Sequence, residues 1–325
     1  MNAPLKSPFP YFGGKRKAAP LVWERFWKLD NYVEPFFGSG AVLLGRPEPF
    51  GGSETVNDLD GLLSNFWRAI KSQPDVVAEY ADWPVNENDL HARHAWLVGQ
   101  KDSLQARLEG DPEFYDAKAA GWWVWGTACW IGSGFCSGNG PWQVVERGGL
   151  RQLVHLGTSG QGVNRQLVHL GDAGQGVNRQ REELLSYFRQ ISERFRDVRV
   201  CCGDWSRVCG PSVTYKHGLT GVFLDPPYAD TAERAENLYR SDSTAVAHDV
   251  REWAIAEGSN PLMRIALCGY ESEHDMPDGW ECVHWNAGAG FGGQRTDGAS
   301  QNGKKERIWF SPHCERVDLF APRLL

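Results

Sequence analysis

The sequence lacks several features that would place the chain in a simple class. Its eight cysteines include no C-x-x-C pair and no spacing typical of a metal site, so we expect reduced, mostly buried thiols and no metal. The most apolar stretch, residues 122–131, is about half as long as a membrane span. The first residues contain no apolar segment of the kind found in signal peptides. We therefore expect a cytoplasmic protein without membrane contact.

An excess of positive charge is also missing. Lys and Arg number 34 against 41 Asp and Glu, a net charge of −7, so binding of a polyanion would require a local basic patch. The hydrophobic fraction of 41% and the charged fraction of 23% exclude a mainly disordered or fibrous chain. With 325 residues, we expect one large domain or two ordinary ones. Trp is abundant, and its 15 residues must lie in a core, on stacking surfaces, or both.

Strand and helix patterns alternate over most of the chain. An apolar run at 31–37 leads into Gly38-Ser39-Gly40 and a helix start. Another run at 55–56 precedes apolar residues at helical spacing from 59 to 70. This alternation predicts an α/β fold with a mostly parallel, doubly wound, Rossmann-like sheet. Further strands are expected at 198–202, 221–224, 264–268, 280–285 and 306–310, of which the last two, joined without a helix, would form an antiparallel pair at the edge.

The middle of the chain is predicted to interrupt this sheet. Residues 75–135 read as mostly helical, and a Gly-rich stretch without periodicity follows. A tandem repeat, RQLVHLGTSGQGVN and then RQLVHLGDAGQGVN, occupies 151–178. Its alternating residues before a Gly-rich turn predict a hairpin arm, although duplication of a tolerant surface loop is an alternative. We expect an inserted region at 75–197 within a sheet-forming domain of 1–74 and 198–325.

The tetrapeptide Asp225-Pro226-Pro227-Tyr228 is the sharpest motif. It follows four apolar residues, so it lies at the carboxyl end of a strand, where open α/β sheets bind their ligands. The Asp225 carboxylate and the Pro226 carbonyl are acceptors for an exocyclic amino group, and the prolines remove backbone donors. The Tyr228 ring can stack on a planar base. Together these groups predict a pocket for an amino group on an aromatic ring.

Three further features carry binding chemistry. Gly38 and Gly40 permit close approach of the backbone to a ligand, but position 43 is Leu, so the G-x-G-x-x-G pattern of dinucleotide sites is incomplete. Asp58 ends the next strand, 58 − 38 = 20 residues later, and can accept hydrogen bonds from a ribose. Lys15 lies in Tyr-Phe-Gly-Gly-Lys-Arg, which lacks the Ser or Thr of a phosphate loop and suits a ligand carboxylate better.

With these motifs in this order, the chain resembles the Dam-like DNA N6-adenine methyltransferases, which use S-adenosylmethionine. The matching motifs are the aromatic-x-G-G-K, the E-P-F-x-G-x-G, an acidic residue that ends the second strand, and D-P-P-Y, found here at 11–15, 34–40, 58–60 and 225–228. Residues 134–139 and 202–205 are similar to two shorter family stretches. The resemblance implies a site-specific adenine methyltransferase with an inserted DNA target-recognition region.

The resemblance also implies roles for individual residues. Asp225, Pro226 and Tyr228 would be catalytic, binding an adenine that has flipped out of double-stranded DNA. Lys15 would lie near the cofactor carboxylate and Asp58 on its ribose. The full set of expected cofactor-binding residues is Tyr11, Lys15, Gly38, Gly40, Asp58, Asp204, Trp205 and Asp225, with Asp204 and Trp205 at the cofactor adenine.

DNA binding needs local positive charge, and one segment supplies it. Residues 145–181 include five Arg, one Glu and one Asp, so the net charge of this segment is 5 − 2 = +3. Arginine suits phosphates and guanine edges, although a solvated loop would look the same. The expected DNA-binding residues are Arg147, Arg151, Arg165, Arg179 and Arg181. A weaker candidate is Lys304, Lys305 and Arg307.

Other functions remain open at this level. The same fold acts on cytosine N4 or on other amino groups, and Asp225 favours adenine by family analogy. A non-catalytic DNA-binding module would not require the complete motif set, and a nicotinamide oxidoreductase would require the complete glycine pattern. Orphan, restriction-linked and phage-borne enzymes share these motifs. We expect a monomer, while the sequence leaves other oligomeric states open.

Overall fold

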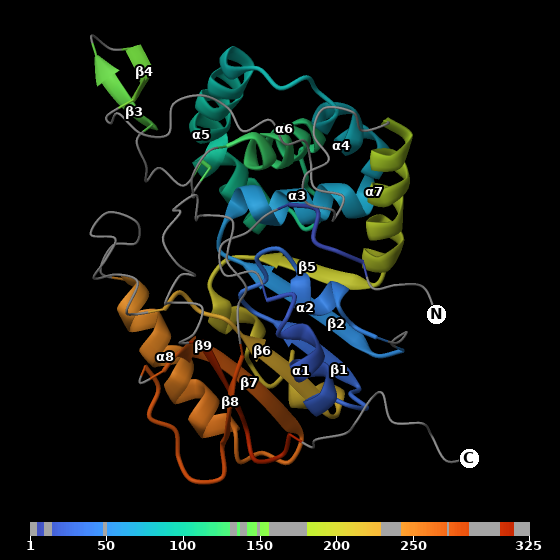
Figure 1. Cartoon of the computed structure of the whole chain (residues 1–325), viewed down its shortest axis with the longest axis vertical. Helices are drawn as coiled ribbons and strands as arrows, with labels where there is room; N and C mark the ends of the chain where they lie inside the picture. Colours follow the sequence, from blue (N-terminus) through green and yellow to red (C-terminus); the bar gives the residue numbers. More distant parts are fainter. Residues whose placement is uncertain are drawn as a thin grey trace. The chain divides into compact units, whose positions relative to one another are not determined.

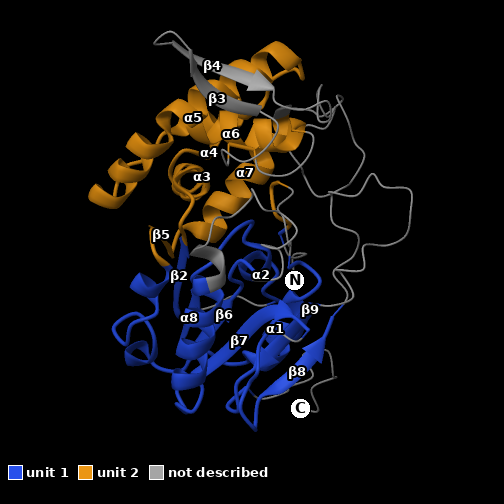
Figure 2. Cartoon of the chain, turned by 90° about the vertical axis from the view of Figure 1, so that its left-hand side faces the viewer, with its two compact units in different colours: residues 1–5, 13–57, 205–325 blue, residues 6–12, 58–204 orange. Residues whose placement is uncertain are grey.

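The computed structural model describes most of the chain in two compact units. The described residues are 5–9, 15–47, 51–130, 135–136, 142–147, 150–155, 181–228, 242–271, 273–285 and 306–314, with the backbone alone at 142–147, 150–155, 181 and 242–244. Unit 1 comprises residues 1–5, 13–57 and 205–325, and unit 2 comprises 6–12 and 58–204 (Figure 2).

A seven-stranded sheet organises the fold (Figure 1). Strand β1 pairs in parallel with β2 and β6, and β6 pairs in parallel with β7. Strand β9 is antiparallel to both β7 and β8. The predicted α/β sheet with an antiparallel edge is therefore confirmed. The order is β5 (Val198–Cys202), β2 (Ser53–Asp58), β1 (Asn31–Glu34), β6 (Thr220–Leu224), β7 (Met263–Tyr270), β9 (Glu306–Phe310) and β8 (Glu281–His284).

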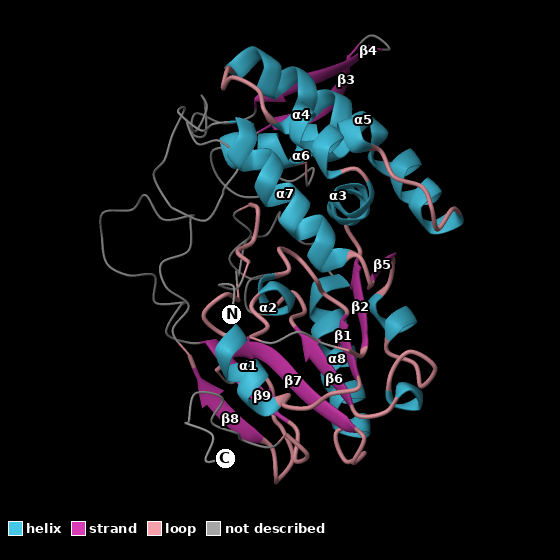
Figure 3. Cartoon of the chain, turned by 90° about the vertical axis from the view of Figure 1, so that its right-hand side faces the viewer, coloured by secondary structure: helices cyan, strands magenta, loops and turns pink. Residues whose placement is uncertain are grey.

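The central strands of unit 1 are buried along their whole length. Figure 3 shows these strands and the helices of the unit coloured by secondary structure. Strand β6 reads Thr-Gly-Val-Phe-Leu and β7 reads Met-Arg-Ile-Ala-Leu-Cys-Gly-Tyr, which are the nearly continuous apolar runs of a parallel sheet covered on both faces. The helices of this unit are α1 (Ala19–Arg25), α2 (Ala41–Leu44) and α8 (Asp242–Glu257), with short 3-10 turns at Trp205–Val208 and Tyr215–His217. The apolar runs therefore predicted the position of these strands.

Unit 2 is mainly helical, as expected for the middle of the chain. Its helices are α3 (Gly61–Ser72), α4 (Pro74–Ala81), α5 (Glu87–Gly110), α6 (Ala117–Cys129) and α7 (Arg181–Phe195). Asp60, Asn86 and Asp116 cap three of them through side-chain oxygens that accept backbone N–H bonds. The core is aromatic: Trp67 stacks on Phe195 with centroids 4.8 Å apart. Much of the Trp excess is thus used for packing.

Helix α3 belongs to unit 2 because its aromatic side chains pack there. Phe66 contacts Trp123 of α6 and Phe188 of α7, with ring centroids 5.8 Å and 6.1 Å apart. This division by contacts begins at residue 58, earlier than the expected insertion at 75–197. The expected boundaries describe a functional division and stay a prediction. In the part of the chain that the structure describes, no helix combines the length and the apolar character needed to cross a membrane.

A hairpin follows α6 along the chain. Strands β3 (Trp142–Arg147) and β4 (Leu150–His155) are antiparallel, with Trp142 opposite His155 and Arg147 opposite Leu150. The first residues of the tandem repeat form β4, so the hairpin begins earlier than the repeat pattern predicts, with its first strand ahead of the repeat. The remaining repeat residues, 156–178, lie outside the described residues.

Candidate active site

Three acidic residues lie where parallel strands end. Glu34 is the last residue of β1, Asp58 is the last residue of β2, and Asp225 directly follows β6. These strands are neighbours in the order β2-β1-β6 and run in the same direction. Their carboxyl ends therefore share one edge of the sheet, which is where open α/β sheets bind ligands.

Asp225 forms a buried ion pair with Lys15. The Lys15 Nζ lies 3.0 Å from Asp225 Oδ1 and 3.7 Å from Glu306 Oε2. The Lys15 side chain is 5% exposed and that of Asp225 is 20% exposed. Burial by itself lowers the pKa of Lys15, but the negative charges around it, with Asp225 foremost, outweigh burial and raise that pKa above its usual value. Lys15 therefore stays charged and holds one oxygen of the D-P-P-Y carboxylate.

Tyr228 contacts the same oxygen. Its hydroxyl donates to Asp225 Oδ1 at 3.1 Å, and the Lys15 Nζ lies over its ring, 5.2 Å from the centroid. Burial raises the pKa of the Tyr228 phenol well above its usual value, and the Asp225 charge adds to this, so the hydroxyl remains a donor. Two donors thus act on Oδ1, and no described residue hydrogen-bonds to Asp225 Oδ2. This geometry leaves Oδ2 as an acceptor.

Two buried carboxyl groups near Asp225 were not among the predicted site residues. The Glu34 carboxyl accepts a 2.8 Å hydrogen bond from the Tyr32 hydroxyl, and burial, opposed by this bond, raises the pKa of Glu34 well above its usual value. Glu306 is the first residue of β9 and pairs with Tyr270, the last residue of β7. Because β9 is antiparallel, its first residue lies where β7 ends. The antiparallel edge in the sequence pattern was thus the signal that could have identified Glu306.

The glycine turn after β1 has a backbone that other residues adopt rarely. Gly38 and Gly40 have φ angles of 50° and 67°. A Cβ on Gly40 would lie 2.6 Å from Cζ of Phe37, so any side chain there forces a shift. The Phe37 backbone N–H donates to the Asn57 carbonyl at 2.9 Å, which ties the turn to β2. The two glycines are therefore required by the turn, as the motif predicts.

Asp58 lies close to Gly203 and Asp204 of the Cys-Gly-Asp-Trp stretch, which belong with it to unit 2. Its carboxylate accepts a 2.9 Å bond from the Asp60 N–H, and its carbonyl accepts a 3.0 Å bond from the Gly203 N–H. Asp204 is exposed. Asp58, which is half-buried, and Asp204 thus flank one backbone hydrogen bond, and their roles in a site stay a prediction.

Trp205, in unit 1, faces aromatic partners. Its ring stacks on Phe36 with centroids 6.2 Å apart and planes at 25°, and it meets Trp253 edge-on at 6.2 Å. Phe36 belongs to the glycine-turn motif, so the fold brings two motifs that are distant in the sequence into contact. A flat aromatic surface of this kind suits a purine ring.

Several predicted residues lie outside the described part of the chain. Tyr11, Arg165 and Arg179 are outside the described residues. The structure gives only the backbone of Arg147 on β3, Arg151 on β4 and Arg181 at the start of α7. In the weaker basic candidate, Lys304 and Lys305 also lie outside, and Arg307 pairs with Glu271 at 2.6 Å. The five arginines stay a prediction.

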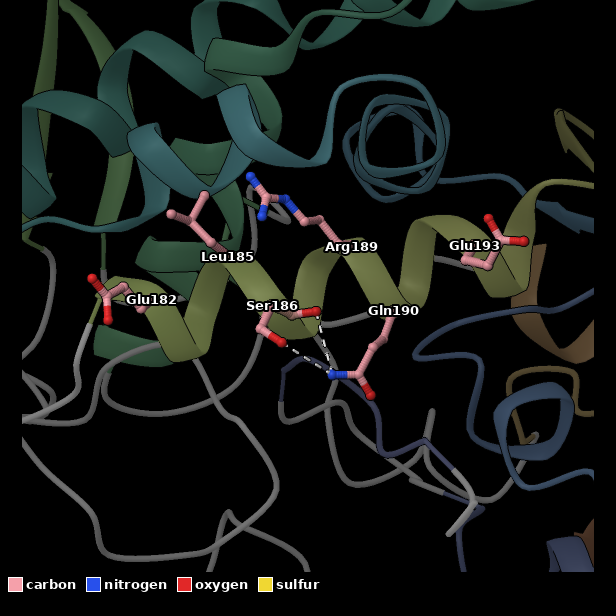
Figure 4. A pocket seen from close by; sticks show the side chains of 6 residues that line it. All are labelled: Glu182, Leu185, Ser186, Arg189, Gln190 and Glu193. Atoms are coloured by element: carbon pink, nitrogen blue, oxygen red, sulfur yellow. Dashed lines mark hydrogen bonds between the residues drawn. The ribbon is translucent and has the colours of Figure 1, made fainter. Parts of the chain in front are cut away.

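A cavity of about 400 Å³ lies elsewhere, along one face of α7 (Figure 4). Within it, the Gln190 amide donates to the Ser186 carbonyl at 3.3 Å, and Arg189 pairs with Asp75 at 2.7 Å. None of its lining residues belongs to the motifs above. No group of three or more potential metal ligands occurs among the described residues. The lining residues are Glu182, Leu185, Ser186, Arg189, Gln190 and Glu193.

Comparison with known families bears on this geometry. Residues 11–96 match the family of D12 class N6 adenine-specific DNA methyltransferases. The match indicates an adenine-specific DNA methyltransferase. It confirms the Dam-like family and the enzyme class that the motifs predict, and it includes the aromatic-x-G-G-K, the glycine turn and Asp58. No match was found among curated proteins. The match ends before Asp225, so the roles of the D-P-P-Y residues in this adenine methyltransferase are proposals.

Proposed function

We propose that the protein transfers a methyl group from S-adenosylmethionine to the N6 amino group of an adenine flipped out of double-stranded DNA. The observation that carries the proposal is the state of Asp225. Lys15 and Tyr228 both contact its Oδ1, and no described residue hydrogen-bonds to its Oδ2. A carboxylate held in this way at the end of a central strand is suited to accept a hydrogen bond from an amino group.

The residues at this edge of the sheet fit the cofactor. When bound, S-adenosylmethionine supplies a methyl group activated by a sulfonium. Gly38 and Gly40 keep the turn after β1 free of side chains, and Trp205 offers an aromatic face for the adenine. Asp58 is proposed to accept hydrogen bonds from the ribose, with Asp204 and Tyr11 completing the binding set.

For Lys15 we propose a role that differs from the one the resemblance implies. The ion pairs with Asp225 and Glu306 support a role at the reacting carboxylate rather than at the cofactor carboxylate. Contact with the cofactor carboxylate would draw Lys15 away from Glu306, which is buried, and from Asp225, which is partly buried, and this is costly. We therefore propose that Lys15 orients Asp225.

The proposed chemistry uses acceptors to direct a weak nucleophile. Asp225 Oδ2 and the Pro226 carbonyl accept hydrogen bonds from N6, which favours a more tetrahedral, more nucleophilic nitrogen. The bound cofactor would supply the methyl group to the N6 lone pair that these acceptors direct, and its sulfur would keep the electrons of the broken methyl–sulfur bond. N6 finally releases one proton to water. Correct alignment contributes up to about 7–11 kcal/mol of the lowered barrier.

Tyr228 is proposed to serve the target base as well as Asp225. Flipping the adenine out of the duplex costs a few kcal/mol, and stacking on an aromatic ring offsets part of this cost. Lys15 lies over one face of the Tyr228 ring and the Tyr270 ring packs against it with centroids 4.7 Å apart, so the base would use the part of the ring that these contacts leave exposed. The same tyrosine would then fix the carboxylate and the base plane together.

An Asp225→Asn variant tests this proposal. It keeps the shape of the side chain but removes its charge, and we expect turnover to fall by about 10²–10³ with the fold retained. The matched control is Asp278→Asn, because Asp278 is exposed in the same unit. Formation of N6-methyladenine in duplex DNA is the readout. Near-normal turnover in Asp225→Asn would remove Asp225 from the mechanism.

DNA contact is proposed for the arm that begins at β3. Its five arginines carry the local positive charge that an acidic chain needs to meet a phosphate backbone. We further propose that the enzyme acts in the cytoplasm as a monomer. The catalytic residues of the proposal lie in unit 1, while the arm belongs to unit 2.

A further inference from the structure

Glu306 is a buried residue with a poorly paired carboxylate. Its Oε2 is inaccessible and has no hydrogen-bond partner among the described residues. The Lys15 Nζ lies 3.7 Å from this oxygen, an ion pair beyond hydrogen-bond distance. Burying a charged carboxylate in this way costs several kcal/mol unless it is well paired. Packing therefore does not explain the residue.

Neutralisation of Lys15 does not explain Glu306 either. Asp225, at 3.0 Å, already pairs with the ammonium. With Glu306 included, one positive charge meets two negative charges, and the sum is 1 − 2 = −1. Glu34 is left out of this sum because burial raises its pKa well above the usual value; burial also raises the pKa of Glu306, but the nearby Lys15 charge opposes that rise. Glu306 thus gives the cluster a surplus negative charge.

This surplus negative charge would favour the proposed methyl transfer. The inference therefore rests on the proposed function. Without Glu306, the Lys15 charge would fully offset that of Asp225 and weaken its oxygens as acceptors. With Glu306 present, the ammonium is shared between two carboxylates. During the transfer, positive charge develops on N6, and a preorganised negative environment stabilises it.

We propose that Glu306 is a positioning residue for methyl transfer: it holds Lys15 together with Asp225 and leaves the cluster with a net negative charge toward the reacting nitrogen. Glu306 does not need to touch the substrate for this role. It acts through Lys15 on the acceptor strength and orientation of Asp225.

The test is Glu306→Gln, which keeps the size of the side chain and removes its charge. We expect kcat to fall about tenfold while KM for DNA changes little, because Glu306 acts on Asp225 through Lys15 and does not touch the DNA. We also expect thermal stability to stay equal or rise, because a buried charge is removed. Glu306→Asp, which keeps the charge, restores part of kcat. The matched control is Glu271→Gln, since Glu271 is exposed and pairs with the neighbouring Arg307.

A binding measurement tests the effect of the Glu306 charge on the site without relying on turnover. Sinefungin carries a positively charged amine at the position of the sulfonium of S-adenosylmethionine. S-adenosylhomocysteine has a neutral sulfur at this position. Calorimetry gives the ratio of their affinities for each variant. We expect Glu306→Gln to lower the preference for sinefungin about threefold or more, since the removed charge lies in a low-dielectric site. Glu271→Gln leaves the ratio unchanged.

The outcomes are distinct. An unchanged kcat and an unchanged affinity ratio in Glu306→Gln would overturn the inference, and so would a loss of kcat that follows a loss of thermal stability. If the wild-type protein made no N6-methyladenine, the proposed function would fail, whereas the affinity ratio would still decide whether Glu306 charges the site.

Discussion

Replacement of Lys15 by Met should destabilise the protein in a manner that depends on pH. The substitution removes the only cation that the described structure places within 4 Å of Asp225 and Glu306, and leaves two carboxylates in a buried setting. Removing one partner of a buried pair costs about 3–5 kcal/mol. Because the Asp225 side chain is 20% exposed, we expect the lower end, about 3 kcal/mol of unfolding free energy at pH 8.

The sign of the pH dependence follows from the two partners. In the wild type the pKa of Lys15 is raised, so its contribution is fully present below the unfolded pKa and is lost only at strongly alkaline pH. In Lys15→Met, the pH dependence of stability is determined by Glu306. Burial already raises its pKa, and the loss of Lys15 raises it further. A folded pKa above the unfolded value makes the variant relatively more stable at low pH, so its penalty should grow from pH 5 to pH 8.

Urea unfolding at pH 5 and pH 8, followed by Trp fluorescence, measures this difference. The matched control is Lys71→Met, because the Lys71 Nζ donates to the Val198 carbonyl at 2.8 Å and has no carboxylate as its closest partner. Its cost should be about 1 kcal/mol and similar at both pH values. An equal penalty for Lys15→Met at pH 5 and pH 8, or no penalty at pH 8, would refute the ion-pair account.

Two further predictions concern the ligands. Trp205→Ala removes the ring that stacks on Phe36, so calorimetry should show about three- to tenfold weaker binding of S-adenosylhomocysteine; an unchanged affinity would exclude Trp205 from the cofactor site. Deletion of one repeat copy, residues 151–164, removes Arg151 and shortens the arm. It should weaken DNA binding and reduce the slope of log affinity against log salt by about 0.9 for each phosphate that the arm no longer neutralises, and if neither changes, the arm does not contact DNA.

The sheet was largely predictable because each central strand is a short apolar run followed by a turn signal. The run before Asp225 and the run at 264–268 both became buried parallel strands, β6 and β7. The antiparallel edge was also predicted, since no helical pattern separates the last two strands. The position of β9 between β7 and β8 was not predicted, because strand order depends on pairing between segments that are distant in the sequence.

The site was predictable where chemistry and a local motif coincide. Asp225 and Tyr228 are close together in one tetrapeptide, and the structure joins them by a hydrogen bond. Glu306 was not found, because its neighbours in space are distant in the sequence. Lys15 is 306 − 15 = 291 positions away and Asp225 is 306 − 225 = 81 positions away. A buried charge on a strand gives no local pattern that separates it from an exposed one. Lys15 was found, but its partners were not, for the same reason.

The most direct test of the central claim is nucleoside mass spectrometry. Unmethylated duplex DNA would be incubated with the protein and S-adenosylmethionine, digested and analysed, with Asp225→Asn as the matched negative control. The account predicts N6-methyladenine with the wild-type protein and at least about a hundredfold less with the variant. N4-methylcytosine in place of N6-methyladenine, or equal methylation by both proteins, would contradict it.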